Sequence, residues 1–163
     1  MVNKMNGNVK DIQYLLEHNV NGWEISSLDI NYFAETISFI VESVKGQNII
    51  KTHVTFKEVL SYFIYQEPVV YDQESNKTYR LNDREYSDNN FVSEIGYHQN
   101  GFGKIKIESL NRDLTAIEDI SSSTNFYFQV NNKDHFFIEA NEVQINDETF
   151  SDLLQSSGNL KIQ

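Results

Sequence analysis

The sequence contains no cysteine, and this absence excludes disulfides, thiolate nucleophiles and cysteine-ligated zinc sites. Its only proline is Pro68 and its seven glycines are scattered, so no linker rich in proline or glycine divides the chain. No apolar run approaches the roughly 18 to 20 residues that span a membrane, and Asp11 and Glu17 interrupt the apolar stretch near the N-terminus. We therefore expect a single domain over residues 1–163 in a cytoplasmic protein without a membrane partner.

Basic residues are also scarce: 13 Lys and Arg stand against 24 Asp and Glu, which gives a formal net charge of −11. Such a charge repels phosphate backbones unless the basic residues cluster, and Lys104 and Lys106 are the tightest pair with matched orientation. Nucleic acid is therefore an unfavourable partner. The acidic surface either steers a basic partner protein or serves only solubility.

Bulky apolar residues are abundant, with 39% hydrophobic residues that include 11 Phe and 9 Tyr. A chain of 163 residues with this composition buries roughly two thirds of its unfolded surface and does not resemble a disordered polypeptide. The sequence predicts a folded globular protein.

Apolar residues alternate with polar ones over Thr124–Phe150, and the polar run Asn131–Asp134 interrupts them where a turn is expected. This pattern predicts a strand, a turn and a long strand. The apolar set changes parity after Ala140, so we expect a bulge or corner over Ala140–Glu142 that brings both sets inside. Leu153 and Leu154 are expected to close the end as a helical turn.

The same period of two recurs earlier in the chain, over Leu28–Tyr32, Ile37–Val41 and Ile50–Phe56. From Val59 to Tyr65 apolar residues occupy both odd and even positions, so they would lie on both faces of a strand. This predicts a bulge near Lys57–Leu60 followed by a half-strand buried on both faces.

The Asn100-Gly101 pair predicts a hairpin between strands at Phe91–Tyr97 and Gly103–Leu110, with Ile107 pointing inward. A short helix is expected over Leu110–Ile120.

These patterns give about eight strands with short connections. We predict a mainly β fold, an antiparallel sandwich or partly closed barrel. An N-terminal amphipathic helix spans residues 8–19, a β-rich core spans 25–150 and a C-terminal tail spans 151–163.

No motif of known catalytic chemistry occurs: there is no GxSxG elbow, P-loop or GxGxxG. The four histidines, His18, His53, His98 and His135, never share the spacing that presents two of them to one metal. Asp83, Glu85 and Asp88 crowd one polar loop but lack the ordered spacing of a calcium loop. We predict no catalytic, cofactor or metal site.

Several segments resemble the YxiG-like family of small bacterial proteins, over about Ile25–Phe150. The block Val54–Val59 with Ser61-Tyr62-Phe63, and the later Phe137–Ala140, carry most of the likeness. The N-terminal helix lies outside it. The resemblance implies relatives encoded near polymorphic toxin genes in Gram-positive bacteria and a role as an immunity or accessory protein, and it brings no active-site residues.

The first functional hypothesis is a non-enzymatic protein-binding module, an immunity or accessory protein whose partner is a basic toxin domain and which is a monomer or a dimer. Its interface is expected at Asp83, Glu85, Asp88, Glu139 and Glu142, with Glu139 and Glu142 on an exposed face beside Asn141. The alternative is a small-ligand carrier with a barrel interior lined by Phe39, Phe56, Phe128 and Phe136. A third hypothesis, an enzyme that uses a carboxylate with histidine, needs both groups in a cleft.

Overall fold

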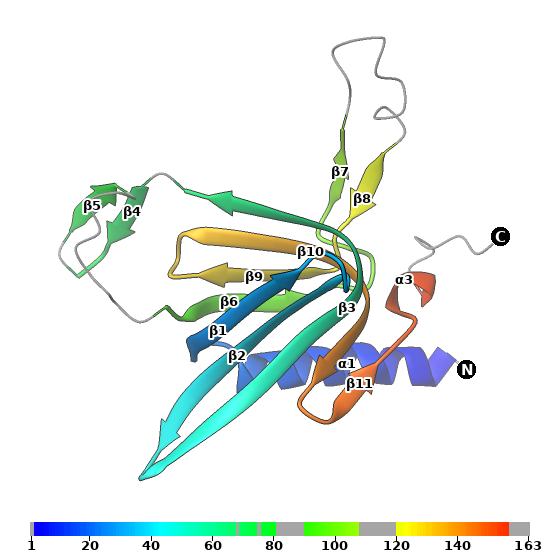
Figure 1. Cartoon of the computed structure of the whole chain (residues 1–163), viewed down its shortest axis with the longest axis horizontal. Coiled ribbons are helices and arrows are strands. Elements are labelled where there is room, and N and C mark those ends of the chain that lie inside the picture. Colours follow the sequence, from blue (N-terminus) through cyan, green and yellow to red (C-terminus); the bar gives the residue numbers. More distant parts are fainter. Residues whose placement is uncertain (1, 68, 75, 81–89, 108–119, 157–163) are drawn as a thin grey trace.

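The computed structural model describes residues 2–67, 69–74, 76–80, 90–107 and 120–156 (Figure 1). In chain order the elements are α1 (Val2–Asn19), β1 (Glu24–Asn31), β2 (Thr36–Lys45), β3 (Asn48–Gln66), β4 (Val69–Asp72), β5 (Lys77–Arg80), β6 (Val92–Tyr97), β7 (Lys104–Lys106), β8 (Ser121–Ser123), β9 (Phe126–Val130), β10 (Asp134–Ile145), β11 (Glu148–Phe150) and α3 (Leu153–Ser156).

A seven-stranded antiparallel sheet forms the body of the molecule, in the order β1-β2-β3-β10-β9-β6, with β11 paired to β10. Two small hairpins, β4-β5 and β7-β8, extend from it (Figure 1). The predicted fold class is confirmed, because the chain is mainly β, antiparallel and led by a helix. The sheet is not closed, although its outer strands meet at one corner, where Glu24 bridges Phe91 and Ile25 N donates to Asn90 O at 2.7 Å.

The two longest strands, β3 and β10, bend together and are shared by both halves of the sheet (Figure 1). Their register passes from Ser61 opposite Glu139 to Val59 opposite Ala140, which leaves Leu60 as an extra residue on β3. Glu58 adopts a positive φ of 50° at this point. The bulge predicted near Lys57–Leu60 is therefore confirmed, and it re-aims the second half of β3.

Phenylalanine rings from both halves of the bent sheet meet in the core. Phe39 packs against Phe128 with centroids 5.1 Å apart, and Phe56 against Phe126 at 4.8 Å. On β10, Phe136 stacks on Phe128 at 4.4 Å. The parity change predicted after Ala140 is confirmed as well, since apolar residues on both sides of the corner are buried.

Helix α1 lies along the open side of the sheet and contacts β6 (Figure 1). Ile12 and Leu16 are fully buried against the core, as the amphipathic pattern predicted, and Val20, just after the helix, is buried as well. Gln13, on the same side, accepts a hydrogen bond of 2.9 Å from Tyr97 N. The helix therefore covers part of the outer edge of β6.

The hairpin predicted around Asn100-Gly101 is wrong. The turn itself forms, with Gly101 N donating to His98 O at 2.9 Å, but Phe102 N then donates to Thr124 O at 2.8 Å and the chain leaves the sheet. Strand β6 pairs with β9 and β7 pairs with β8, and Ile107, predicted to point inward, is exposed. Pairing of β6 with β9 places Ile95 opposite Phe128 in the core, and this long-range burial outweighs the local turn preference.

Leu153 and Leu154 of α3 are buried, as predicted for a closing helical turn. The short helix predicted over Leu110–Ile120 falls almost wholly on residues 108–119, outside the described residues. In the described part of the chain, no helix has the length and apolar character needed to cross a membrane.

Candidate functional site

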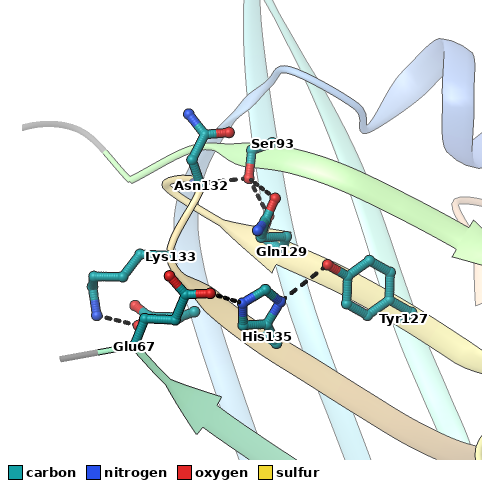
Figure 2. A network of polar contacts seen from close by, with 8 residues as sticks. Glu67, Ser93, Tyr127, Gln129, Asn132, Lys133 and His135 are labelled. Atoms are coloured by element: carbon teal, nitrogen blue, oxygen red, sulfur yellow. Dashed lines mark hydrogen bonds and ion pairs between the residues drawn. The ribbon is translucent and has the colours of Figure 1, made fainter. Parts of the chain in front are cut away.

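A chain of three polar side chains runs across the outer face of the sheet where β3 ends (Figure 2). His135 on β10 is its centre: Nε2 lies 2.9 Å from Glu67 Oε1, and Nδ1 lies 3.1 Å from the hydroxyl of Tyr127 on β9. Sheet pairing fixes this geometry, because His135 lies opposite Tyr65 on β3 and opposite Gln129 on β9. Tyr127, two residues before Gln129, is thus a diagonal neighbour of His135 on the same face. A carboxylate, an imidazole and a phenol are thereby held in one line.

The electrostatics around Tyr127 do not favour its phenol as a nucleophile or base. Burial raises the pKa of Tyr127, and the nearby carboxylates of Glu94 and Glu67 raise it further. A phenol used as a nucleophile or base needs the opposite shift. The contacts of His135 with Glu67 and Tyr127 fix these side chains on the outer face of the sheet.

The turn between β9 and β10 forms hydrogen bonds with the residues at the start of β6. Asn131 and Asn132 adopt positive φ values of 57° and 56°, a conformation that asparagine tolerates better than most residues. Asn131 Oδ1 accepts from Phe91 N at 2.9 Å, and Asn132 N donates to Ser93 Oγ at 2.9 Å (Figure 2). Lys133 is only 1% exposed and pairs with the carboxylate of Asp134. The predicted turn is confirmed, and its hydrogen bonds connect the start of β10 to Phe91 and Ser93.

Aromatic rings continue outward from this polar line as a stripe that crosses β3, β10 and β9. Phe63 lies 5.8 Å from Phe137, which lies 5.1 Å from Tyr127, and Tyr127 lies 5.8 Å from Phe102, all between ring centroids. A surface hollow of about 480 Å³ adjoins Tyr127 and Phe102 and includes Glu94. Cross-strand aromatic pairs stabilise a sheet, and exposed ones also offer a flat apolar surface to a partner.

The second half of β3, Leu60–Gln66, which we call the β3 strip, exposes apolar side chains on both faces. Leu60 is 55% exposed, and Tyr62, Phe63, Ile64 and Tyr65 are exposed as well. At one end it borders a groove of about 500 Å³ that includes Tyr32 and Phe33 of the β1-β2 turn. Double burial was predicted here and is wrong, because the bulge turns this half of β3 away from the core. Contiguous exposed apolar surface of this kind marks interaction sites.

The interface residues predicted from sequence are placed differently. Glu139 is only 7% exposed, and Asn141 is also buried, so the expectation of an exposed face there is wrong. Glu139 is covered by serines of β3 and β8, and Asn141 bonds to Glu58 and to Leu154 N. Glu142 is partly exposed, 3.8 Å from Lys57 Nζ, and its role at an interface stays a prediction.

The remaining predicted interface residues, Asp83, Glu85 and Asp88, lie outside the described residues. Of the predicted interface residues, only Glu139 and Glu142 are therefore described by the structure.

Glu139 has compensating hydrogen-bond partners. Its Oε2 accepts from Ser123 N at 2.8 Å, and the hydroxyls of Ser122 and Ser61 also interact with it and with each other. Burial raises the pKa of this carboxyl, and these hydrogen bonds oppose the rise. The cluster joins β3, β8 and β10 at the corner of the sheet.

Metal binding finds no support in the described residues, which contain no group of three His, Asp or Glu side chains arranged to hold an ion. His18 stacks on Tyr14 in α1, and His53 and His98 are exposed. Each of the four histidines thus has a different neighbourhood.

A model of the YxiG-like protein family matches residues 12–150. The chain belongs to the YxiG-like family. The match begins at Ile12, so most of the packed part of α1 lies within the region shared by this YxiG-like protein and its family, contrary to the expectation that the helix lies outside. No curated protein and no solved structure matches the chain.

Sequence reasoning missed the β3 strip and the Glu67–His135–Tyr127 line. The strip did carry a signal, since apolar residues on both parities with two tyrosines are compatible with a buried strand and with an exposed edge. The polar line carried none, because Glu67 and His135 are 68 positions apart.

Proposed function

We propose that this protein is a non-enzymatic protein-binding module that holds a basic partner, as an immunity or accessory protein of a bacterial toxin system in the cytoplasm. The exposed apolar surface of the β3 strip is the observation that carries the proposal. Large apolar side chains exposed side by side cost solubility unless a partner covers them. The toxin setting rests on the resemblance of the chain to the YxiG-like family.

Charge supports a basic partner. The chain carries a formal net charge of −11, and Glu35, Glu58 and Glu67 lie beside the β3 strip or border the adjoining groove. Opposite charge on the partner speeds association and makes it sensitive to salt.

The ligand-carrier alternative finds less support. Phe39, Phe56, Phe128 and Phe136 were expected to line an open interior, yet each is at most 9% exposed and their rings pack on one another. The space between the two halves of the sheet is occupied by these side chains.

The test is co-purification of the full chain, at low and at high ionic strength, with the toxin domain that the proposal expects to be encoded beside it. We expect recovery at low salt that falls at high salt, and loss of recovery in Phe63→Ser. Val44→Ser is the matched control, since Val44 is 72% exposed but lies near the distal β2-β3 turn. Failure to recover the toxin domain at low salt contradicts the proposed function. An equal loss of recovery in Phe63→Ser and Val44→Ser contradicts the assignment of the β3 strip as the binding surface.

A further inference from the structure

One edge of the β3 strip has no neighbouring strand within the described residues. Strand β3 pairs with β10 from Val54 to Gln66 but with β2 only from Asn48 to Phe56. The last contact on the β2 side is Val59 N donating to Glu35 O at 3.0 Å. Beyond it β3 runs along the margin of the sheet (Figure 1). Its backbone groups on that side are therefore available to another strand.

The register identifies which backbone groups face this open edge. Ile138 O accepts from Asn125 N at 3.0 Å, so this carbonyl of β10 points toward β9. In an antiparallel sheet, a residue whose backbone N–H and C=O point toward the strand on one side forms no backbone hydrogen bond with the strand on the other side. Tyr62, opposite Ile138 on β3, therefore directs its N–H and C=O away from β10, and the alternation repeats at Ile64.

Proteins usually protect such an edge with charges, prolines or a covering segment. The chain does so at β6, where the side chain of Gln13 accepts from Tyr97 N. The β3 strip, LSYFIYQ, contains neither a charge nor a proline, and both of its faces are apolar. The outer edge of β6 is thus partly covered by a side chain of α1, whereas the β3 strip carries none of these protective features.

We propose that the β3 strip binds an extended segment of a basic partner protein by β-strand addition. Backbone hydrogen bonds to Tyr62 and Ile64 supply affinity, and the groove beside Tyr32 and Phe33 receives an apolar side chain of the segment. This inference deepens the proposed function, on which it rests, by naming the shape and the chemistry of the partner.

Charge selects a basic segment over a second copy of this chain. Glu58 and Glu67 stand at the two ends of the β3 strip. Antiparallel pairing of two β3 strips centred on Phe63 brings Glu58 of one copy close to Glu67 of the other, and both copies carry −11. Like charges facing one another disfavour that pairing. Lysine or arginine at the ends of an added segment is attracted instead to these carboxylates, each of which also contacts a side chain of β10, Glu58 with Asn141 and Glu67 with His135.

The probe is a synthetic peptide of alternating valine and threonine with lysines at both ends, titrated against the full chain. We expect binding that weakens with salt, and no binding of the same peptide with glutamates at its ends. Absence of binding by the lysine peptide overturns strand addition, whereas the proposed function is judged separately by recovery of the toxin domain. Equal binding of both peptides overturns the charge assignment.

Two variants isolate the backbone contact. Ile64→Pro removes the outward N–H without removing a bond to β10, and Ile64→Ala shortens the side chain but keeps the N–H. We expect Ile64→Pro to bind the lysine peptide about tenfold more weakly than Ile64→Ala. Equal affinities overturn the proposal.

Sedimentation of the wild-type chain supplies the remaining check. We expect it to stay monomeric without peptide. If the wild-type chain is a dimer and Ile64→Pro is a monomer, the open edge of the β3 strip binds a second copy of the chain. That result overturns the proposal of a basic partner.

Discussion

Asn141 Nδ2 donates a hydrogen bond of 2.7 Å to Glu58 Oε2, and this contact joins β10 to β3 where both strands bend. Asn141 is buried and also accepts from Leu154 N through Oδ1 at 3.1 Å, so one amide holds the bulge and the start of α3 together. The side chain of Glu58 thereby offsets part of the backbone strain at its positive φ of 50°.

Glu58→Ala is expected to lower the free energy of unfolding by about 1 to 3 kcal/mol, because it leaves a buried amide donor of Asn141 without its acceptor. Glu58→Gln keeps an oxygen acceptor at the same place and is expected to lose less. Urea unfolding of the three proteins measures the difference. Equal stabilities of Glu58→Ala and Glu58→Gln would show that this bond does not hold the corner.

A substitution in the core of the bent sheet is expected to lower the free energy of unfolding much more. Phe128→Ala removes a fully buried ring that packs against Phe39 and Phe136 from both sides, which is expected to cost about 3 to 5 kcal/mol. Phe33→Ala, at a side chain 94% exposed, is the matched control and is expected to change stability little. Similar losses for the two variants in urea would contradict the packing.

Much of this fold was predictable because its strands alternate. The closing hairpin, with its turn at Asn131–Asp134, and helix α1 follow from local period and turn chemistry. The pairing of β6 was not predictable from its Asn-Gly turn, since the competing strand β9 lies about 30 positions further along the chain.

The candidate site was hardly predictable at all. Exposure of the β3 strip depends on the extra residue Leu60, and a local pattern does not reveal which way a bulge turns the strand after it. Glu139 looked like a surface carboxylate, yet the corner of β10 buries it against serines from two other strands. Both outcomes depend on long-range pairing.

The contact between α1 and β6 predicts a local change in hydrogen exchange. Gln13→Ala removes the acceptor of Tyr97 N, so the Tyr97 amide is expected to exchange faster and the chain to lose about 1 kcal/mol of stability. Lys10→Ala, at an exposed position of the same helix, is the control. Unchanged protection of the Tyr97 amide in Gln13→Ala would argue that another group covers this edge.

Glu139 predicts how stability changes with pH. Burial raises its pKa in the folded chain above the ordinary value of 4.5, so the folded state holds the proton more tightly than the unfolded state. The stability that this proton contributes is fully present below about 4.5 and is lost as pH rises through the raised value. Glu139→Gln does not titrate, so its stability relative to the wild type is expected to increase with pH over this range.

Urea unfolding of the wild type and Glu139→Gln at a series of pH values measures this difference. Glu148→Gln, at the exposed first residue of β11, removes the same charge and is the control. A stability difference between wild type and Glu139→Gln that stays constant over the series, or that matches Glu148→Gln, would mean that the hydrogen bonds from Ser123 N and the two serine hydroxyls fully offset the burial of the carboxylate.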